Sequence, residues 1–165
     1  MIEQIKKSEF GLEGTLECPL FAQPLDVLID GADVEYAQRC ADALCALPEE
    51  TLLRLCKYSV RYCEWFRSLV PDVDIGVPEG TEGRAILEHI FPGSLIVTVP
   101  EDGRVGYSLE LECDWEPEHG MEWTILDGKV KYVGPYESTS PWDDMAYTGF
   151  YQEGAKLNMN FADRE

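Results

Sequence analysis

The order of apolar and polar residues predicts two strands, then two helices, then a strand-rich second half. Residues 10–20 and 24–30 show the short apolar bursts, broken by turn residues, of two paired strands. A first helix is predicted from the N-cap Asp33 to about Leu47, because apolar residues recur there at helical spacing. A longer helix over residues 48–70 begins with proline and two glutamates, which suit a helix N-terminus.

The longer helix carries a second, aromatic stripe formed by Tyr58, Tyr62 and Trp65. A helix wedged between a sheet and another element would show this pattern, and so would a helix that presents an aromatic ridge to a partner. Large exposed apolar patches are scarce on soluble proteins, which favours the core interpretation.

The second half begins with a linker-like stretch, residues 71–81, which is rich in proline, glycine and acidic residues. Asp127-Gly128 is the strongest hairpin signal of the chain, because this pair tolerates the positive φ angles of a two-residue turn. The further predicted elements are a short helix over residues 82–90, strands over residues 94–99, 105–115, 121–126 and 129–134, a short helix starting at Ser140, and an edge strand over residues 156–161.

The Asp127-Gly128 turn also predicts the register of its hairpin. Two cross-strand pairs follow on one face, Ile125 with Val130 and Trp123 with Tyr132. The other face then carries Thr124, Lys129 and Lys131, and we expect it to be wet.

These elements predict an α+β fold, in which an antiparallel β-meander has one face covered by a pair of N-terminal helices. We expect a single domain over residues 1–165, since each half alone would be short of core. It would comprise an N-terminal hairpin and helices (residues 1–70), the linker (71–81) and a β-rich half (82–165).

Composition limits the possible partners. Of the 165 residues 45% are hydrophobic, which is enough for a folded core, and the formal net charge is −19. This charge repels phosphate, so we expect no binding to nucleic acid or to anionic membranes, and we expect cationic or neutral partners. The chain has no run of apolar residues long enough to span a bilayer, and we expect it to be cytoplasmic.

The six cysteines are expected to be buried free thiols. No C-x-x-C motif is present, four cysteines fall in apolar helical stripes, and the chain is larger than the small disulfide-rich secreted domains. A zinc site is therefore not expected.

The stretch "ELECDWEPEHGMEW", residues 110–123, has six carboxylates, one histidine and no lysine or arginine. Side chains alternate along a strand, so Ser108, Glu110, Glu112 and Asp114 should face water while Leu109, Leu111, Cys113 and Trp115 point inward. Lys129 or Lys131 on a neighbouring strand could offset part of the charge. The following "EPEHG" places Glu116, Glu118 and His119 in a loop, where binding groups are often found.

Two kinds of chemistry are conceivable here. A metal site would use Asp114, Glu116, Glu118 and His119, but no further histidine or cysteine cluster completes it, and His89 lies far earlier in the sequence. In an acid–base site His119 would shuttle protons with Glu118 or Asp114 orienting it, yet no nucleophile or catalytic motif accompanies them. A histidine in such a loop more often caps backbone groups through its ring nitrogens, so we expect no catalytic residue, metal or cofactor.

The segments "DWEPEHGMEW" and "DGKVKYVG" resemble the signature hairpin of a family of uncharacterised bacterial domains of unknown function. In that family the hairpin follows an N-terminal hairpin, here "EFGLEGTLECPLF", and a pair of helices, here residues 33–70. The resemblance implies no established activity. It does imply that some relatives occur near bacterial toxin systems, where an immunity role is expected of them.

The leading hypothesis is therefore a non-enzymatic binding domain that captures a cationic protein surface, with an immunity-type role as its finer form. Its expected binding residues are Glu110, Glu112, Asp114, Trp115, Glu116, Glu118 and His119. The alternative is a small hydrolase or metal-binding enzyme centred on residues 114–119. A third possibility is that the acidic surface serves only solubility.

Overall fold

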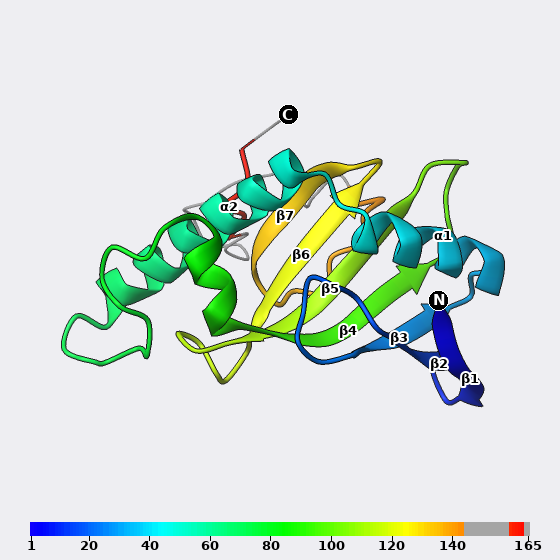
Figure 1. Ribbon diagram of the computed structural model, residues 1–165, viewed down its shortest axis with the longest axis horizontal. Coiled ribbons are helices and arrows are strands. Elements are labelled where there is room, and N and C mark those ends of the chain that lie inside the picture. Colours follow the sequence, from blue (N-terminus) through cyan, green and yellow to red (C-terminus); the bar gives the residue numbers. More distant parts are fainter. Residues whose placement is uncertain (144–158, 164–165) are drawn as a thin grey trace, which may run out of the picture.

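Seven strands form one sheet in the order β1-β2-β3-β4-β5-β6-β7 in the computed structural model, which describes residues 1–143 and 159–163 (Figure 1). Neighbouring strands are antiparallel except β3 and β4, which run parallel. The fold is thus α+β, but the sheet is not the purely antiparallel meander that we expected. The strands are β1 (Ile2–Ser8), β2 (Gly11–Leu16), β3 (Leu25–Asp30), β4 (Ile90–Thr98), β5 (Gly106–Cys113), β6 (Met121–Leu126) and β7 (Lys129–Pro135).

The N-terminal edge of the sheet contains a strand that the sequence pattern did not predict. β1 pairs with β2 and has a bulge between Glu3 and Lys6, with Gln4 at φ 55°. Most of its side chains are exposed, so it lacks the alternation that marks a strand with one buried face. The predicted pairing of the next two strands is confirmed, because β2 and β3 are antiparallel neighbours.

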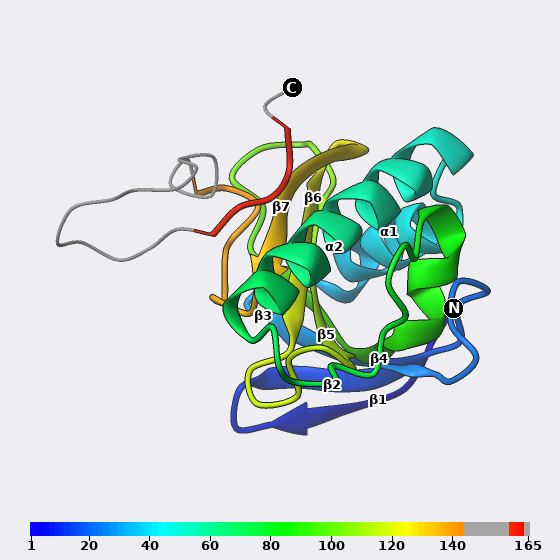
Figure 2. The ribbon, with the colours of Figure 1, turned by 90° about the vertical axis from the view of Figure 1, so that its left-hand side faces the viewer.

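The connection between the parallel strands β3 and β4 contains the three helices, α1 (Val34–Cys45), α2 (Glu49–Leu69) and the 3-10 helix η1 (Gly83–His89). Asp33 caps α1, and its carboxylate accepts a hydrogen bond from the Tyr36 backbone N–H at 2.7 Å. α1 and α2 lie on the same side of the sheet (Figure 2). None of the helices in the described ranges is long and apolar enough to cross a lipid bilayer.

The hydrophobic core lies between the helices and this face of the sheet. Its largest buried side chains include Tyr62 of α2, Trp115 and Trp123. The indole N–H of Trp123 donates to the Ser59 hydroxyl at 3.0 Å and so ties β6 to α2. All six cysteines are free thiols, and five of them are buried, as expected.

The linker-like stretch after α2 is folded onto the protein. Ile75 and Val77 are buried in the core, and the Arg67 guanidinium of α2 donates to the Val77 carbonyl at 2.8 Å. Proline, glycine and acidic residues indicated only the loop conformation, whereas the two apolar residues between them attach the loop to α2.

The β6–β7 hairpin follows the predicted register near its turn only. Ile125 pairs with Val130, but a bulge in β7 then places Tyr132 opposite Thr124, and Trp123 faces Val133. The predicted Trp123–Tyr132 pair is therefore wrong. The extra residue in the bulge shifts every later residue of β7 by one position relative to β6.

The second face of the sheet is not wet throughout. Ser108, Thr124 and Lys131 are buried there, because residues 136–142, which we call the strap, run across this face. The Ser108 hydroxyl donates to the Thr139 carbonyl at 2.7 Å, and the Lys131 ammonium donates to the Pro141 carbonyl at 2.7 Å. The expectation of a water-facing surface fails at Ser108, Thr124 and Lys131 for this reason.

Two C-terminal predictions lie partly outside the described residues. Residues 141–142 form a turn, and the remainder of the helix expected from Ser140 is not described. Residues 159–163 form no strand, but the Phe161 N–H donates to the Val133 carbonyl at 2.8 Å, and the Asn160 side chain also bonds to β7. This segment therefore covers part of the outer edge of β7.

Candidate functional site

The acidic stretch of the sequence is divided between two surfaces in the structure. Glu110 and Glu112 lie on β5 and face away from the helices, whereas residues 114–119 form the loop that joins β5 to β6 and line a groove. The seven residues predicted to bind a partner therefore do not form one site. Asp114, Trp115, Glu116, Glu118 and His119 do lie together at the groove.

The predicted alternation along β5 is confirmed at its C-terminal end. Leu109, Leu111 and Cys113 are 0%, 1% and 3% exposed, whereas Glu112 is exposed and Glu110 is half-buried. The neighbours of Glu110 across the sheet are Ser94 and Glu122, so neither of the two residues paired with it is the lysine that we expected.

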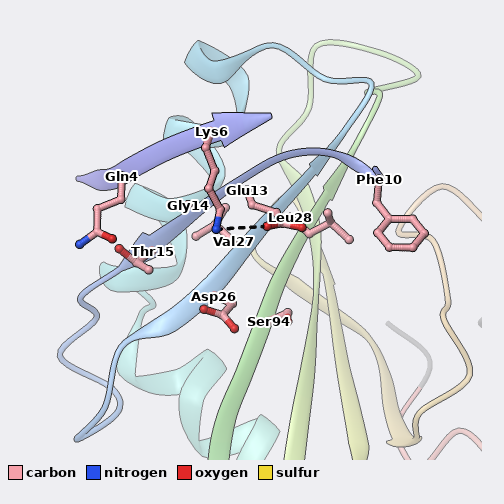
Figure 3. Close-up of a pocket in the computed structure, with 10 residues that line it drawn as sticks. All are labelled: Gln4, Lys6, Phe10, Glu13, Gly14, Thr15, Asp26, Val27, Leu28 and Ser94. Atoms are coloured by element: carbon pink, nitrogen blue, oxygen red, sulfur yellow. Dashed lines mark ion pairs between the residues drawn. The ribbon is translucent and has the colours of Figure 1, made fainter. Parts of the chain in front are cut away.

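A second hollow lies on the outer face of the N-terminal strands (Figure 3). Its volume is about 370 Å³, and the Lys6 ammonium forms an ion pair with the Glu13 carboxylate there at 3.8 Å. Phe10, at the turn between β1 and β2, borders the hollow and is 67% exposed. Since the ion pair neutralises two of its charged groups, the hollow has little net charge with which to select a ligand.

The groove is larger, with a volume of about 670 Å³. Its walls come from the C-terminal part of α2, the loop that follows α2, the β5–β6 loop and the first residues of the strap. Its apolar lining includes Trp65, Phe66, Leu69, Val73 and Trp115. Leu69 and Val73 both line the groove and are 57% and 59% exposed, so the groove presents apolar surface to solvent.

The lining of the groove is strongly acidic. Five carboxylates contribute to it, and no lysine or arginine does so among residues 1–143 and 159–163. The carboxylates belong to Asp74, Asp114, Glu116, Glu118 and Glu137. An apolar surface with one sign of charge around it favours a ligand that is itself apolar and carries the opposite charge.

The β5–β6 loop is held by its own hydrogen bonds. The Glu116 side chain is 9% exposed and accepts from the His119 backbone N–H at 3.1 Å, while the Gly120 N–H donates to the Glu116 carbonyl at 3.0 Å. Gly120 has a φ of +68°, and a Cβ atom there would lie 2.5 Å from the Leu111 carbonyl oxygen. Only glycine therefore fits at the point where the chain returns to the sheet.

The two histidines have different partners from those that the sequence suggested. The His119 ring does not cap the backbone, because its Nδ1 lies 3.1 Å from the Glu116 carboxylate. Asp114 pairs instead with His89, whose Nδ1 is 2.9 Å from its carboxylate. The backbone N–H of Asp114 also donates to the His89 carbonyl, since β4 and β5 are neighbours and η1 ends where β4 begins.

Three possible metal ligands of the loop, one buried and two exposed, lie close together. One ligand atom from each of Glu116, Glu118 and His119 can be chosen so that all three lie within 4.8 Å of one another. Asp114, which we considered as a fourth ligand, does not belong to this group. Structural sites for zinc use four protein ligands, and catalytic sites use three and an open position.

Trp115 links the loop to the aromatic residues of α2. It is 1% exposed, and its ring meets that of Tyr62 edge-on, with centroids 5.8 Å apart. Within the described ranges its indole N–H has no hydrogen-bond partner. The aromatic stripe of α2 thus serves two purposes, because Tyr58 and Tyr62 are buried while Trp65 is half-buried and lines the groove.

The contribution of α2 and of the loop after it to this site was not predicted. Leu69 and Val73 come from segments that the sequence marked as a helix end and a linker, and nothing local distinguishes them from core residues. The acidic residue Asp74 is the one feature of this loop that could have indicated its place in an acidic groove.

Comparison with known proteins gives a family but no activity. No curated protein and no solved structure shows significant similarity to the chain. The model of a domain of unknown function, DUF6985, matches residues 1–140, which is most of the chain, so this protein belongs to the DUF6985 family.

Proposed function

We propose that this protein is a non-enzymatic binding domain, which holds a positively charged and partly apolar segment of a partner protein in the groove between α2 and the β5–β6 loop. The observation that carries the proposal is the lining of the groove. Aliphatic and aromatic side chains are open to solvent there, with five carboxylates around them.

The two features have different roles in binding. Burial of Leu69 and Val73 would supply affinity, at roughly 25 cal/mol for each Å² of apolar surface removed from water. The carboxylates would steer a cationic partner toward the groove and disfavour acidic ones. Lysine and arginine match both features, because an apolar stem carries their charged group.

The resemblance to a family of uncharacterised domains, some of which occur near toxin systems, suggests a finer hypothesis, in which the partner is a basic toxin. A toxin that acts on nucleic acid carries a cationic surface, and an acidic protein can cover such a surface. On this proposal the protein acts in the cytoplasm, where its six free thiols would stay reduced.

The proposal can be tested with three short fluorescent peptides. The first consists of lysine and leucine, the second has glutamate in place of lysine, and the third has serine in place of leucine. We expect saturable binding of the first peptide only, measured by fluorescence anisotropy, and we expect its affinity to fall as the salt concentration rises.

Two pairs of variants locate the binding surface. Glu118→Lys should weaken binding of the lysine–leucine peptide about 3- to 10-fold, as expected when an attraction between exposed charges becomes a repulsion. Leu69→Ser should weaken it by a similar factor. The matched controls are Glu101→Lys and Val99→Ser, on the exposed β4–β5 connection, where Val99 is 56% exposed against 57% for Leu69. Equal effects in groove and control variants, or no binding of the first peptide, would refute the proposal.

The alternative of a metal-dependent enzyme rests on the convergence of Glu116, Glu118 and His119. It requires saturable binding of Zn²⁺ or Mn²⁺ by calorimetry, with loss of the signal in His119→Ala. If the wild-type protein binds either metal tightly and the peptides not at all, the enzyme alternative replaces the binding proposal.

A further inference from the structure

A fully buried carboxylate lies beneath the strap. Glu122 on β6 is 0% exposed, although it belongs to the acidic stretch of residues 110–123. Its carboxylate accepts hydrogen bonds from the Thr139 N–H at 2.9 Å, the Glu137 N–H at 3.1 Å and the Thr124 hydroxyl at 2.8 Å. The Thr139 hydroxyl is a fourth donor.

Only a side chain that accepts several hydrogen bonds suits this position. The N–H groups of Glu137 and Thr139 are backbone donors with a fixed direction. Without an acceptor at Glu122 each would lose its hydrogen bond under the strap. Both N–H groups can be satisfied by one carboxylate oxygen, Oε2, at 3.1 and 3.2 Å. The threonine hydroxyls can rotate and either donate or accept.

Burial raises the pKa of Glu122, and the hydrogen bonds from Thr139, Thr124 and Glu137 lower it in part. Glu110 lies opposite it on β5, and Tyr132 on β7 and Glu137 on the strap lie near it. Lys131 of β7 is buried under the same strap. In either protonation state the carboxyl group can accept from both backbone N–H groups, because the hydroxyl groups adapt.

The strap is also part of the groove. Tyr136 and Glu137 line it, next to Pro135 at the end of β7. Glu137 thus lies in the groove wall while its backbone N–H donates to Glu122. The strap has two further attachments to the outer face, from Ser108 to the Thr139 carbonyl and from Lys131 to the Pro141 carbonyl. Among these attachments, the one to Glu122 lies nearest in sequence to the groove wall.

We infer that Glu122 is a positioning residue for the groove: its carboxylate fastens residues 137–139 to the outer face of the sheet and thereby fixes the wall formed by Pro135, Tyr136 and Glu137. The inference rests on the proposed function only in taking the groove as the binding site. The attachment itself can be measured without a ligand.

The test compares three substitutions in the full-length protein. Glu122→Met keeps the approximate length but has no acceptor, Glu122→Asp withdraws the carboxylate by one methylene group, and Glu122→Gln keeps one oxygen that can serve both backbone N–H groups. We expect amide hydrogen exchange at Glu137 and Thr139 to accelerate about tenfold or more in the methionine variant and less in the aspartate variant. Exchange in the glutamine variant should stay close to that of the wild type.

The position of the wall is measured by the NMR signals of the Tyr136 ring in the ligand-free protein and by the affinity for the lysine–leucine peptide. Both should change in Glu122→Met, with affinity about 5- to 10-fold weaker, and both should be preserved in Glu122→Gln. Amides at the centre of β5 and β6 serve as internal references, because they should report only global unfolding.

The outcomes separate this inference from the proposed function. The inference fails if the methionine and aspartate variants lose global stability but match the glutamine variant in exchange rates, Tyr136 signals and peptide affinity. Glu122 would then have a merely structural role. If the methionine variant does not fold, the aspartate and glutamine variants decide. If the wild-type protein binds no peptide, the proposed function fails, while the exchange rates and Tyr136 signals still decide on Glu122.

Discussion

Replacement of Ser59 by alanine should destabilise the protein, because one buried hydrogen-bond donor, the Trp123 indole N–H, loses its acceptor. The Ser59 hydroxyl is 0% exposed, accepts from the Trp123 indole N–H at 3.0 Å and donates to the Leu55 carbonyl at 2.8 Å. The Leu55 carbonyl lies within α2, where helical N–H partners remain, but the indole of Trp123 is fully buried and loses its acceptor. A buried donor without a partner costs about 1–3 kcal/mol.

The same helix offers a matched control. Ser68 donates to the Trp65 carbonyl at 2.6 Å in an exposed position, so Ser68→Ala makes the same chemical change without stranding a buried group. Urea denaturation should show a free energy of unfolding lower by about 1–3 kcal/mol for Ser59→Ala and unchanged within about 0.5 kcal/mol for Ser68→Ala, with equal m-values. If Ser59→Ala costs no more than the control, the bond to Trp123 does not hold α2 on the sheet.

Two further predictions concern the groove loop and the buried carboxylate. Gly120→Ala should lower the free energy of unfolding by more than Gly128→Ala, because only at Gly120 would the added Cβ contact the backbone. Both glycines have positive φ, which costs alanine about 1–2 kcal/mol at either position. Thermal denaturation of the two variants measures the difference. Because burial raises the folded-state pKa of Glu122 above its usual value of 4.5, the folded state binds its proton more tightly, and stability should fall as pH rises from 4.5 through the folded pKa. Urea titrations over this pH range should show a shallower fall in Glu122→Gln, and an identical slope would contradict the assignment.

Local patterns in the sequence predicted the elements that have one buried face. The helical spacing after Asp33 and the alternation from Leu109 to Cys113 each reflect a side that contacts the core and a side that does not. The Asp127-Gly128 turn reflects the positive φ angles of its two residues. β1 escaped detection because almost all of its side chains are exposed, so burial imposes no alternation on it.

The predictions failed where distant segments cover a surface. Glu122, Thr124 and Lys131 have the polar side chains of a wet face, and their burial depends on the strap, which no pattern in β6 or β7 reveals. The alternation of side chains along a strand does not reveal the bulge at Lys131 either. After one extra residue the alternation continues with the two faces exchanged. Among the residues of the groove, the sequence identified those of the β5–β6 loop, because they are consecutive.

The parallel pairing of β3 with β4 explains why these consecutive residues meet α2. β4 begins at Ile90 beside Cys113, the end of β5, so the chain must return to that end of the sheet after leaving β3 at the other. Parallel neighbours need such a crossover, and here α2 and the loop after it provide it (Figure 1). The C-terminal end of α2 therefore lies where β5 turns into β6, and the two segments form the groove together. An antiparallel β3–β4 pair would need no such crossover, because its connection would start and end at the same end of the sheet.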